Sequence, residues 1–213
     1  METMTWLTLS ALCGIVLLAY LSGSIPTGVV LTRLFAGKDI RQLGSCNVGA
    51  TNVRRVAGNR LGAVVLFGDV LKGAVPVYLA MRMHPAFESL FRWELFVSLA
   101  AFFTFAGHLY PAYSMGRSGG KGVATTVGCF LLISPGACAL ALAVFILTLL
   151  RWRMVSLSSI CFAALLPVFV FLKTHSLVFS GLAAVIFIFI FFRHTANIRR
   201  IRQGNEPRIG KST

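Results

Sequence analysis

The stretch VATTVGCFLLISPGACALALAVFILTLL, Val123–Leu150, decides how many times this chain crosses a membrane. As a single helix it would be longer than the ~20 apolar residues that cross a hydrocarbon core. Pro135 and Gly136 favour a turn near its middle, since proline cannot donate a helical hydrogen bond. The sequence therefore predicts two helices here, and the first, Val123–Ser134, spans only about 18 Å at about 1.5 Å per residue. Such a short helix must be shielded by neighbouring helices or begin in a polar pocket within the membrane.

The rest of the chain has the composition of a protein that crosses a membrane several times. Of its 213 residues, 57% are hydrophobic and 12% are charged, which is more apolar surface than a soluble domain of this length can bury. We therefore predict an all-α polytopic membrane protein in which residues 1–213 form a single integral membrane domain. Five further segments are mostly apolar, namely Trp6–Tyr20, Leu61–Ala80, Leu95–Tyr110, Met154–Leu172 and Leu177–Phe192.

The distribution of charge selects among the topologies that these segments allow. Lys and Arg number 20 against 6 Asp and Glu, and they lie mostly at segment ends, which fits the positive-inside rule better than a nucleic-acid partner. With six spans the basic C-terminal tail would lie outside, against that rule. A break at Pro135 gives about seven spans, with the N-terminus outside and the C-terminus cytoplasmic. Cytoplasmic loops are then expected at about residues 35–60 and 112–122, and a cytoplasmic tail at about 193–213.

Two of the apolar segments carry polar interruptions. GSIPTG, Gly23–Gly28, breaks a first span that runs from about Trp6 to Leu34, and it predicts a kink or a close helix contact. Asp69 and Lys72 in the second span are three residues apart and so share one helix face. Ionisable side chains at that depth are costly unless they pair, so we expect the pair to point into the bundle, as a structural or a functional element.

The first polar segment is GSCNVGATNVRR, Gly44–Arg55. It combines hydroxyl and amide side chains with two arginines whose guanidinium groups match phosphate oxygens. An ordinary basic cytoplasmic loop is the alternative, and we favour that alternative for Lys38 and Arg41. It explains Gly44–Arg55 less well, because amides and glycines outnumber the charges there.

A second polar group of residues, the glycine loop Ser118–Gly122, leads directly into the helix predicted from Val123. Its glycines allow successive N–H groups to converge, and the helix N-terminus and Lys121 add positive charge, so the loop suits an anion such as phosphate. It is not a Walker A loop, because Met115 and Gly122 stand where that motif needs Gly and Ser or Thr. A flexible re-entrant turn is the alternative.

The C-terminal segment, His194–Arg208, continues the last apolar span. His194 and Asn197 are three residues apart and therefore share a helix face at the membrane boundary. A lone histidine in such a place is usually structural, but the companion amide and the following Arg200 make a functional role equally plausible. Our hypothesis is that the first polar segment, the glycine loop and the C-terminal segment meet on one face of the membrane and hold a phosphate-bearing substrate.

In order and content these segments resemble the motifs of the bacterial membrane-integral acyl-phosphate:glycerol-3-phosphate acyltransferases. The resemblance covers nearly the whole chain, and it departs from the family pattern at Cys46, where the family usually has Gly, and at Ser118, where a basic residue is common. The matching residues are GSIPTG (Gly23–Gly28), GSCNVGATNVRR (Gly44–Arg55), GDVLKG (Gly68–Gly73), Gly107, His108 and Pro111, GGKGVAT (Gly119–Thr125), and His194, Asn197 and the tail through Glu206 and Pro207.

The resemblance implies transfer of a fatty acyl group from acyl phosphate to the 1-hydroxyl of glycerol 3-phosphate, which gives lysophosphatidate and phosphate for phospholipid biosynthesis. It places the protein in the bacterial cytoplasmic (inner) membrane, in contact with membrane lipid, with the active site on the cytoplasmic face and with no cofactor or metal. The resemblance implies three roles for these residues. Acyl phosphate would be clamped by Lys121 with the backbone of Gly119, Gly120 and Gly122. The site would be lined, and phosphate held, by Ser45, Asn47, Thr51 and Arg55, while glycerol 3-phosphate would be oriented by His194 and Asn197. The proton acceptor, the acyl chain length and the oligomeric state stay open.

Two other classes of protein share features with this sequence. Acyltransferases that use acyl-CoA or acyl carrier protein for this acceptor carry the motif His-x4-Asp. In this chain the fifth residue after each of the four histidines is Ser89, Tyr113, Ser180 or Arg199, and none of these is Asp. The motif is therefore excluded, which favours acyl phosphate as the donor. A membrane transporter of phosphate or an organophosphate would also place glycine-broken helices and basic residues at an anion site. The sequence shows no paired repeat and places its polar segments at one face, which favours the enzyme.

Overall fold

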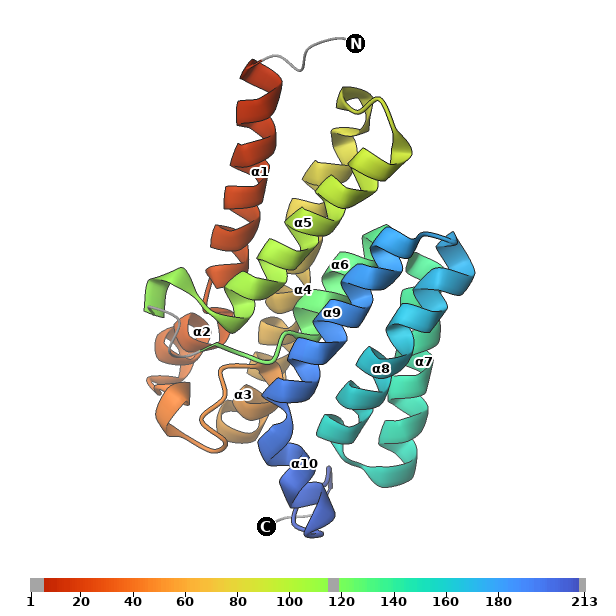
Figure 1. Ribbon diagram of the computed structural model, residues 1–213. Helices are drawn as coiled ribbons and strands as arrows, with labels where there is room; N and C mark the ends of the chain where they lie inside the picture. Colours follow the sequence, from red (N-terminus) through yellow and green to blue (C-terminus); the bar gives the residue numbers. More distant parts are fainter. Residues whose placement is uncertain (1–5, 115–118, 211–213) are drawn as a thin grey trace. The chain divides into compact units, whose positions relative to one another are not determined.

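The computed structural model describes residues 6–114 and 119–210, and these residues form helices and no strands (Figure 1). The chain divides into two compact units, residues 1–132 and 133–213. The all-helical class predicted from the sequence is confirmed. Ser118, one of the two departures from the family pattern, lies outside the described residues.

The first unit contains the α-helices that carry the first polar segment and the glycine loop. They are α1 (Trp6–Ser24), α2 (Thr27–Ala36), α3 (Ala50–Ala57), α4 (Asn59–Arg82), α5 (Leu90–Leu109) and α6 (Val123–Ile133, which begins here). Three short 3-10 turns lie between them, at Ile40–Gln42, His84–Ala86 and Ala112–Ser114.

Helices α1 and α5 lie side by side and approach to backbone contact (Figure 1). A Cβ atom on Gly23 would stand 2.0 Å from the carbonyl oxygen of Thr104, and one on Gly107 would stand 2.3 Å from that of Tyr20. Small residues allow such close packing where van der Waals contact has to hold helices together in lipid. Helix α1 then bends by 42° into α2. Both the predicted kink and the predicted close contact at GSIPTG are confirmed.

The short helix α6 is shielded as the sequence required. It ends at Ile133, next to the break predicted at Pro135. Its Gly128 faces α4 so closely that a Cβ atom there would stand 2.0 Å from the carbonyl oxygen of Val70. Cys129 and Phe130 of α6 are fully buried. Neighbouring helices therefore shield this helix of about three turns, which is too short to cross the membrane alone.

The second unit packs α7 (Pro135–Trp152), α8 (Val155–Thr174) and α9 (Leu177–Arg193) in sequence, and α10 (Thr195–Arg202) follows α9 at an angle of 60°. Both connections between the long helices use a residue in the left-handed region, Arg153 at φ 57° and His175 at φ 53°. In each turn that residue's N–H donates to a carbonyl of the preceding helix, so the helix end is satisfied.

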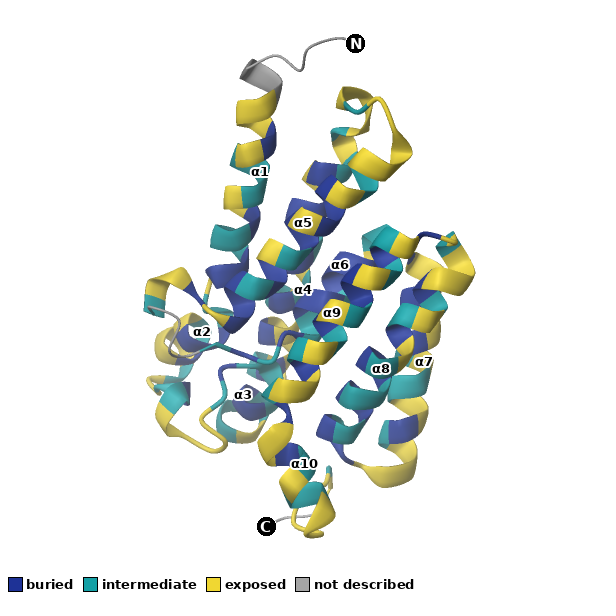
Figure 2. Ribbon diagram, viewed as in Figure 1, coloured by how far each residue is buried: buried dark blue, intermediate teal, exposed yellow. Residues whose placement is uncertain are grey.

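The described helices have the length and the surface of membrane spans. Four helices are long and apolar enough to cross a bilayer, or up to six if α1 with α2 and α9 with α10 each form one bent span, and α6 is a shorter apolar helix. The helices have exposed faces (Figure 2). The large apolar residues that are exposed include Leu34, Leu150 and Leu177. Such faces suit lipid rather than water. The count of seven spans stays a prediction.

Candidate active site

Asn52 organises the first polar segment. Its side chain is 2% exposed; Oδ1 accepts a hydrogen bond from the Ser45 N–H at 2.9 Å, and Nδ2 donates to the carbonyl oxygens of Leu43 and Asn47, each at 2.9 Å. One buried amide therefore fixes the loop that carries the predicted site residues Ser45 and Asn47. The sequence showed Asn52 only as one of the amide side chains of Gly44–Arg55, since only the folded loop shows which amide turns inward.

The predicted residues of this segment lie around that amide, on the loop and on the first turns of α3. Asn47 Oδ1 accepts a hydrogen bond from the Gly49 N–H at 2.9 Å and so leads the chain into the helix. Ser45 and Arg55 are exposed, while Asn47 and Thr51 are half-buried. Hydroxyl, amide and guanidinium groups are thus presented from a short, fixed segment, which is a geometry that can bind an anion.

Cys46 adopts the left-handed region, with φ 56°. A side chain is therefore present at a backbone conformation that favours glycine, the residue that the family pattern usually has there. The left-handed conformation costs an ordinary residue roughly 1–2 kcal/mol.

We expect Cys46→Gly to raise the melting temperature of the purified protein. Relief of the left-handed strain exceeds the entropy that glycine loses on folding, which leaves a net gain of up to about 1 kcal/mol. Thermal unfolding in detergent measures it. Cys13→Gly, the same change within helix α1, is the control and should lower the melting temperature; a decrease in both variants would contradict the strain argument.

The basic residues ahead of this segment hold the loop together. Asp39 accepts hydrogen bonds from Arg41 Nη2 at 2.6 Å and from Arg33 Nη2 at 2.7 Å, and these two guanidinium groups hold the pKa of Asp39 well below its usual range. Lys38 Nζ donates to the carbonyl oxygen of Val56 at 3.2 Å. These contacts agree with the prediction that Lys38 and Arg41 belong to an ordinary basic loop and not to a phosphate site.

The described part of the glycine loop, Gly119–Gly122, lies against the end of α5. A Cβ atom on Gly119 would stand 1.7 Å from the carbonyl oxygen of Leu109, and Gly122, at φ 83°, leaves no room for a side chain beside Phe105. These glycines are therefore needed for close packing, a reason that the sequence argument, which considered only the convergence of N–H groups, did not include.

Gly120 and Lys121 differ in how they are placed. The Gly120 N–H donates to the carbonyl oxygen of His108 at 3.1 Å, so this N–H has a partner within the protein. Lys121 follows at once and is half-buried. Helix α6 then begins at Val123, two residues on, and its N-terminus adds positive potential next to the lysine.

The C-terminal segment is described within the second unit. His194 is 2% exposed and its Nδ1 lies 2.8 Å from the carbonyl oxygen of Ile190, while Asn197 Nδ2 donates to Glu206 Oε1 at 2.7 Å. Both predicted residues are thus buried. The meeting of this segment with the first polar segment and the glycine loop stays a prediction.

Glu206 holds the tail, and sequence reasoning did not assign it a role. Glu206 is 5% exposed as a whole residue, and its carboxylate also accepts a hydrogen bond from Arg200 Nε at 2.8 Å. Burial opposes its ionisation, but the nearby Ser156 hydroxyl, the Asn197 amide and the Arg200 guanidinium outweigh burial and hold the pKa of Glu206 below its usual range. The sequence feature that could have indicated this role is a single acidic residue among the basic residues of the tail, because a buried carboxylate needs a charged or hydrogen-bonding partner.

Comparison with known proteins assigns the family. A sequence profile described as glycerol-3-phosphate acyltransferase matches residues 13–204, which include the first polar segment, the glycine loop and most of the C-terminal segment. Proteins named glycerol-3-phosphate acyltransferase from Syntrophotalea carbinolica and Geobacter sulfurreducens are 47% and 44% identical to this chain, over 91% and 90% of its length and 95% and 94% of theirs.

Solved structures agree with these sequence relatives. A crystal structure of PlsY (YgiH), an integral membrane glycerol 3-phosphate acyltransferase, in its glycerol 3-phosphate form is 36% identical and matches with a TM-score of 0.86, covering 94% of this chain and 96% of that one. Its lysophosphatidic acid form matches with a TM-score of 0.84 at 35% identity. The chain belongs to the glycerol-3-phosphate acyltransferase family.

Proposed function

We propose that this chain is a membrane acyltransferase that moves a fatty acyl group from acyl phosphate to the 1-hydroxyl of glycerol 3-phosphate. The observation that carries the proposal is the family match over residues 13–204, with relatives captured in glycerol 3-phosphate and lysophosphatidic acid forms. Those forms are the acceptor and the product of the same transfer. They favour the enzyme over the phosphate or organophosphate transporter that the sequence had left as the alternative.

The reaction needs two anions held together, and the described residues supply the groups for this. Lys121 binds the phosphate of the donor at the N-terminus of α6, while Ser45, Asn47 and Arg55 of the first polar segment complete the phosphate site. In the C-terminal segment, His194 with Asn197 orients the acceptor. Charge-assisted hydrogen bonds of this kind are the stronger ones in proteins.

The chemistry can proceed by positioning and electrostatic stabilisation. The acceptor hydroxyl oxygen attacks the acyl carbonyl carbon, a C–O ester bond forms, and the bond from that carbon to the phosphate oxygen breaks. Inorganic phosphate leaves with the bonding electron pair, and the hydroxyl proton passes to the leaving phosphate or to His194. Phosphate is a good leaving group, so no covalent enzyme intermediate is required.

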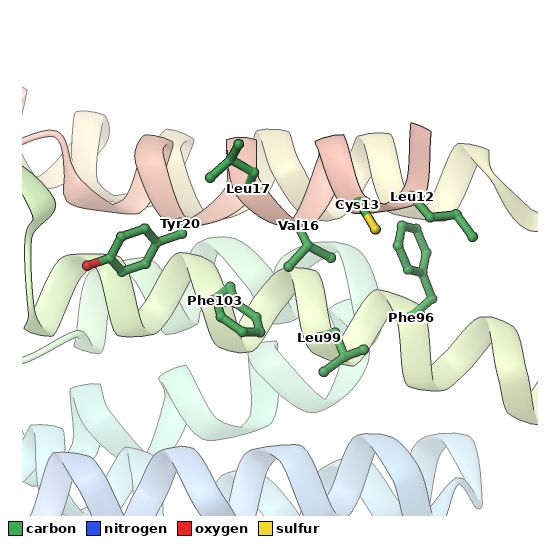
Figure 3. Close-up of a pocket in the computed structure, with 8 residues that line it drawn as sticks. All are labelled: Leu12, Cys13, Val16, Leu17, Tyr20, Phe96, Leu99 and Phe103. Carbon is green, nitrogen blue, oxygen red and sulfur yellow. The ribbon is translucent and has the colours of Figure 1, made fainter. Parts of the chain in front are cut away.

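An apolar groove between α1 and α5 is the proposed site of the acyl tail. It has a volume of about 480 Å³ and is lined by aliphatic and aromatic side chains that include Val16, Leu99 and Phe103 (Figure 3). At one end Tyr20 Oη donates to the carbonyl oxygen of Tyr110 at 2.9 Å. That end is close to the glycine loop, because the same end of α5 carries the carbonyl oxygen against which Gly119 packs.

We expect Leu99→Trp to shorten the acyl chain that the enzyme accepts. The larger side chain fills the groove, so the ratio of kcat/KM for palmitoyl phosphate to that for decanoyl phosphate should fall about tenfold. Leu147→Trp, the same exchange at an exposed position of α7, is the control and should leave the ratio unchanged. A normal ratio in the Leu99 variant would remove the groove from the substrate path.

The proposal includes a topology. Residues 1–213 would form one integral membrane domain of about seven spans in the bacterial inner membrane, with the N-terminus outside and the active site on the cytoplasmic face. The basic residues of the loops and of the C-terminal tail support it, because they then lie on the cytoplasmic side. The short helix α6 supports the count of seven.

Comparison of donors tests the proposal directly. Purified protein should convert palmitoyl phosphate and glycerol 3-phosphate to lysophosphatidate without CoA, and palmitoyl-CoA should not replace the donor. Turnover with palmitoyl-CoA alone would overturn the assignment of the donor. Uptake of phosphate into proteoliposomes, with no lysophosphatidate formed from either donor, would support the transporter.

A further inference from the structure

Three ionisable side chains from two helices meet inside the first unit. Asp69 and Lys72 come from α4 and His108 from the last turn of α5, and they are 2%, 7% and 5% exposed. Lys72 Nζ lies 2.9 Å from Asp69 Oδ1, and His108 Nδ1 lies 3.8 Å from the same oxygen. This confirms that the pair points into the bundle. Ionisable groups within membrane helices are expensive and usually have a function.

The pair holds the break between α1 and α2. Lys72 Nζ donates to the carbonyl oxygen of Ile25 at 3.0 Å, and the hydroxyl of Thr27 donates to Asp69 Oδ1. Ile25 and Thr27 flank Pro26, where the helix is interrupted and its backbone groups need other partners. The ion pair therefore fixes where α2 begins and in which direction it runs.

Helix α2 in turn supports the first polar segment. A Cβ atom on Gly28 would stand 1.9 Å from the carbonyl oxygen of Val48, so the two backbones touch. Val29 of α2 also shares a buried apolar cluster with Val48 and with Val53 of α3. A shift of α2 would therefore move the segment that carries Ser45.

The other side of the cluster supports the glycine loop. The carbonyl oxygen of His108 accepts the Gly120 N–H, and a Cβ atom on Gly120 would stand 2.1 Å from His108 Nε2. The imidazole thus has Asp69 near one nitrogen and the backbone before Lys121 against the other. A rotation of this ring toward Gly120 would displace the loop.

We propose that Asp69, with Lys72 and His108, forms a positioning network that fixes the first polar segment and the glycine loop relative to one another. One carboxylate oxygen serves both supports, through Thr27 and α2 on one side and through His108 on the other. None of the three residues is assigned a contact with the substrate, so each acts through the segment that it holds. The inference rests on the proposed function, because it assigns phosphate binding to both segments.

The ion pair offers a variant that separates positioning from stability. Asp69→Asn combined with Lys72→Met removes both charges at nearly constant volume, so neither charge is left buried without its partner. Asp69→Asn alone leaves a buried ammonium group without its carboxylate and should melt lower. Glu88→Gln with Arg92→Met, which removes an exposed pair at the start of α5, is the matched control for loss of an ion pair.

We expect the double variant to melt higher than Asp69→Asn alone while its kcat/KM falls about tenfold to a hundredfold below that of the wild type, since a misplacement of about 1 Å far from the chemistry can cost about 10²-fold. The rise in melting temperature that inorganic phosphate gives the wild type should also shrink. This second readout involves no acyl donor, so it tests the network even if the proposed donor is wrong. Wild-type turnover and a wild-type phosphate response in the double variant would overturn the proposal.

Variants of His108 test the same network without touching the ion pair. His108→Asn keeps a polar nitrogen on the side of Asp69 and should retain most activity, whereas His108→Ala should lose about tenfold or more in kcat/KM. The melting temperatures of both variants are measured alongside. Equal, wild-type turnover in both variants would show that the ring only fills space, and would overturn the proposal as well.

Discussion

Replacing Lys121 by alanine should abolish most of the acyl transfer while the protein still folds. The lysine is half-buried at the start of α6, where its charge adds to that of the helix N-terminus. Loss of a hydrogen bond to a charged group costs about 1.5–3 kcal/mol. Since each ~1.4 kcal/mol is a factor of ten in rate, kcat/KM should fall by about one to two orders of magnitude.

Steady-state kinetics with separate titration of donor and acceptor measures this loss. Lys121→Arg keeps the charge but not its shape and should recover part of the activity. Lys38→Ala is the matched control, because Lys38 is exposed and donates to the carbonyl oxygen of Val56 in α3, at the far end of that helix from Ser45. It should leave kcat/KM within about twofold of wild type, as surface substitutions usually do. Near-normal turnover in Lys121→Ala would contradict the phosphate clamp.

Replacing Glu206 by alanine should unfold the C-terminal tail. The Glu206 side chain is 3% exposed and accepts hydrogen bonds from Asn197 and Arg200, so its loss removes an acceptor from a buried amide and from a guanidinium group. We expect a loss of about 1–3 kcal/mol in the free energy of unfolding. Glu88→Ala, which breaks an exposed pair with Arg92, is the control and should lose less than about 1 kcal/mol.

The contribution of Glu206 should also depend on pH. Its folded-state pKa lies below its usual value, so the folded state binds the proton less readily than the unfolded chain does. The stability that it provides is therefore complete above the unfolded pKa of about 4.3 and is lost as pH falls through the lower, folded value. Thermal melts of the wild type and Glu206→Ala should converge in that acidic range. A difference that stays constant down to the lowest pH would contradict the ionised carboxylate.

Elements set by local sequence were predictable. Pro26 is flanked by Gly23 and Gly28, and Pro135 is followed by Gly136, so the bend between α1 and α2 and the separation of α6 from α7 could be predicted from the sequence. Proline alone does not decide this, because Pro76 and Pro167 lie inside the continuous helices α4 and α8. The burial of Asp69 with Lys72 was equally accessible, because two opposite charges on one face of an apolar helix must pair.

Elements set by long-range contact were not predictable. Gly120 read as a phosphate-binding glycine, and only the fold shows that its Cα lies against the ring of His108. Asn52 and Glu206 were visible as polar residues, but which polar group turns inward depends on partners that are distant in space or sequence. The sequence pattern identifies which residue types could form a site. Only the packing shows which of these residues support the fold around it.

The claim that the polar segments share one face of the membrane can be tested with a cysteine that the chain already carries. Cys46 is exposed within the first polar segment, and Lys121→Cys in a Cys46→Ser background provides the matching reporter in the glycine loop. Cys13, which is also exposed, is replaced by serine in both proteins. A membrane-impermeant maleimide is added to right-side-out and to inverted vesicles. We expect both positions to be labelled only from the cytoplasmic side, and labelling of the two from opposite sides would contradict the account.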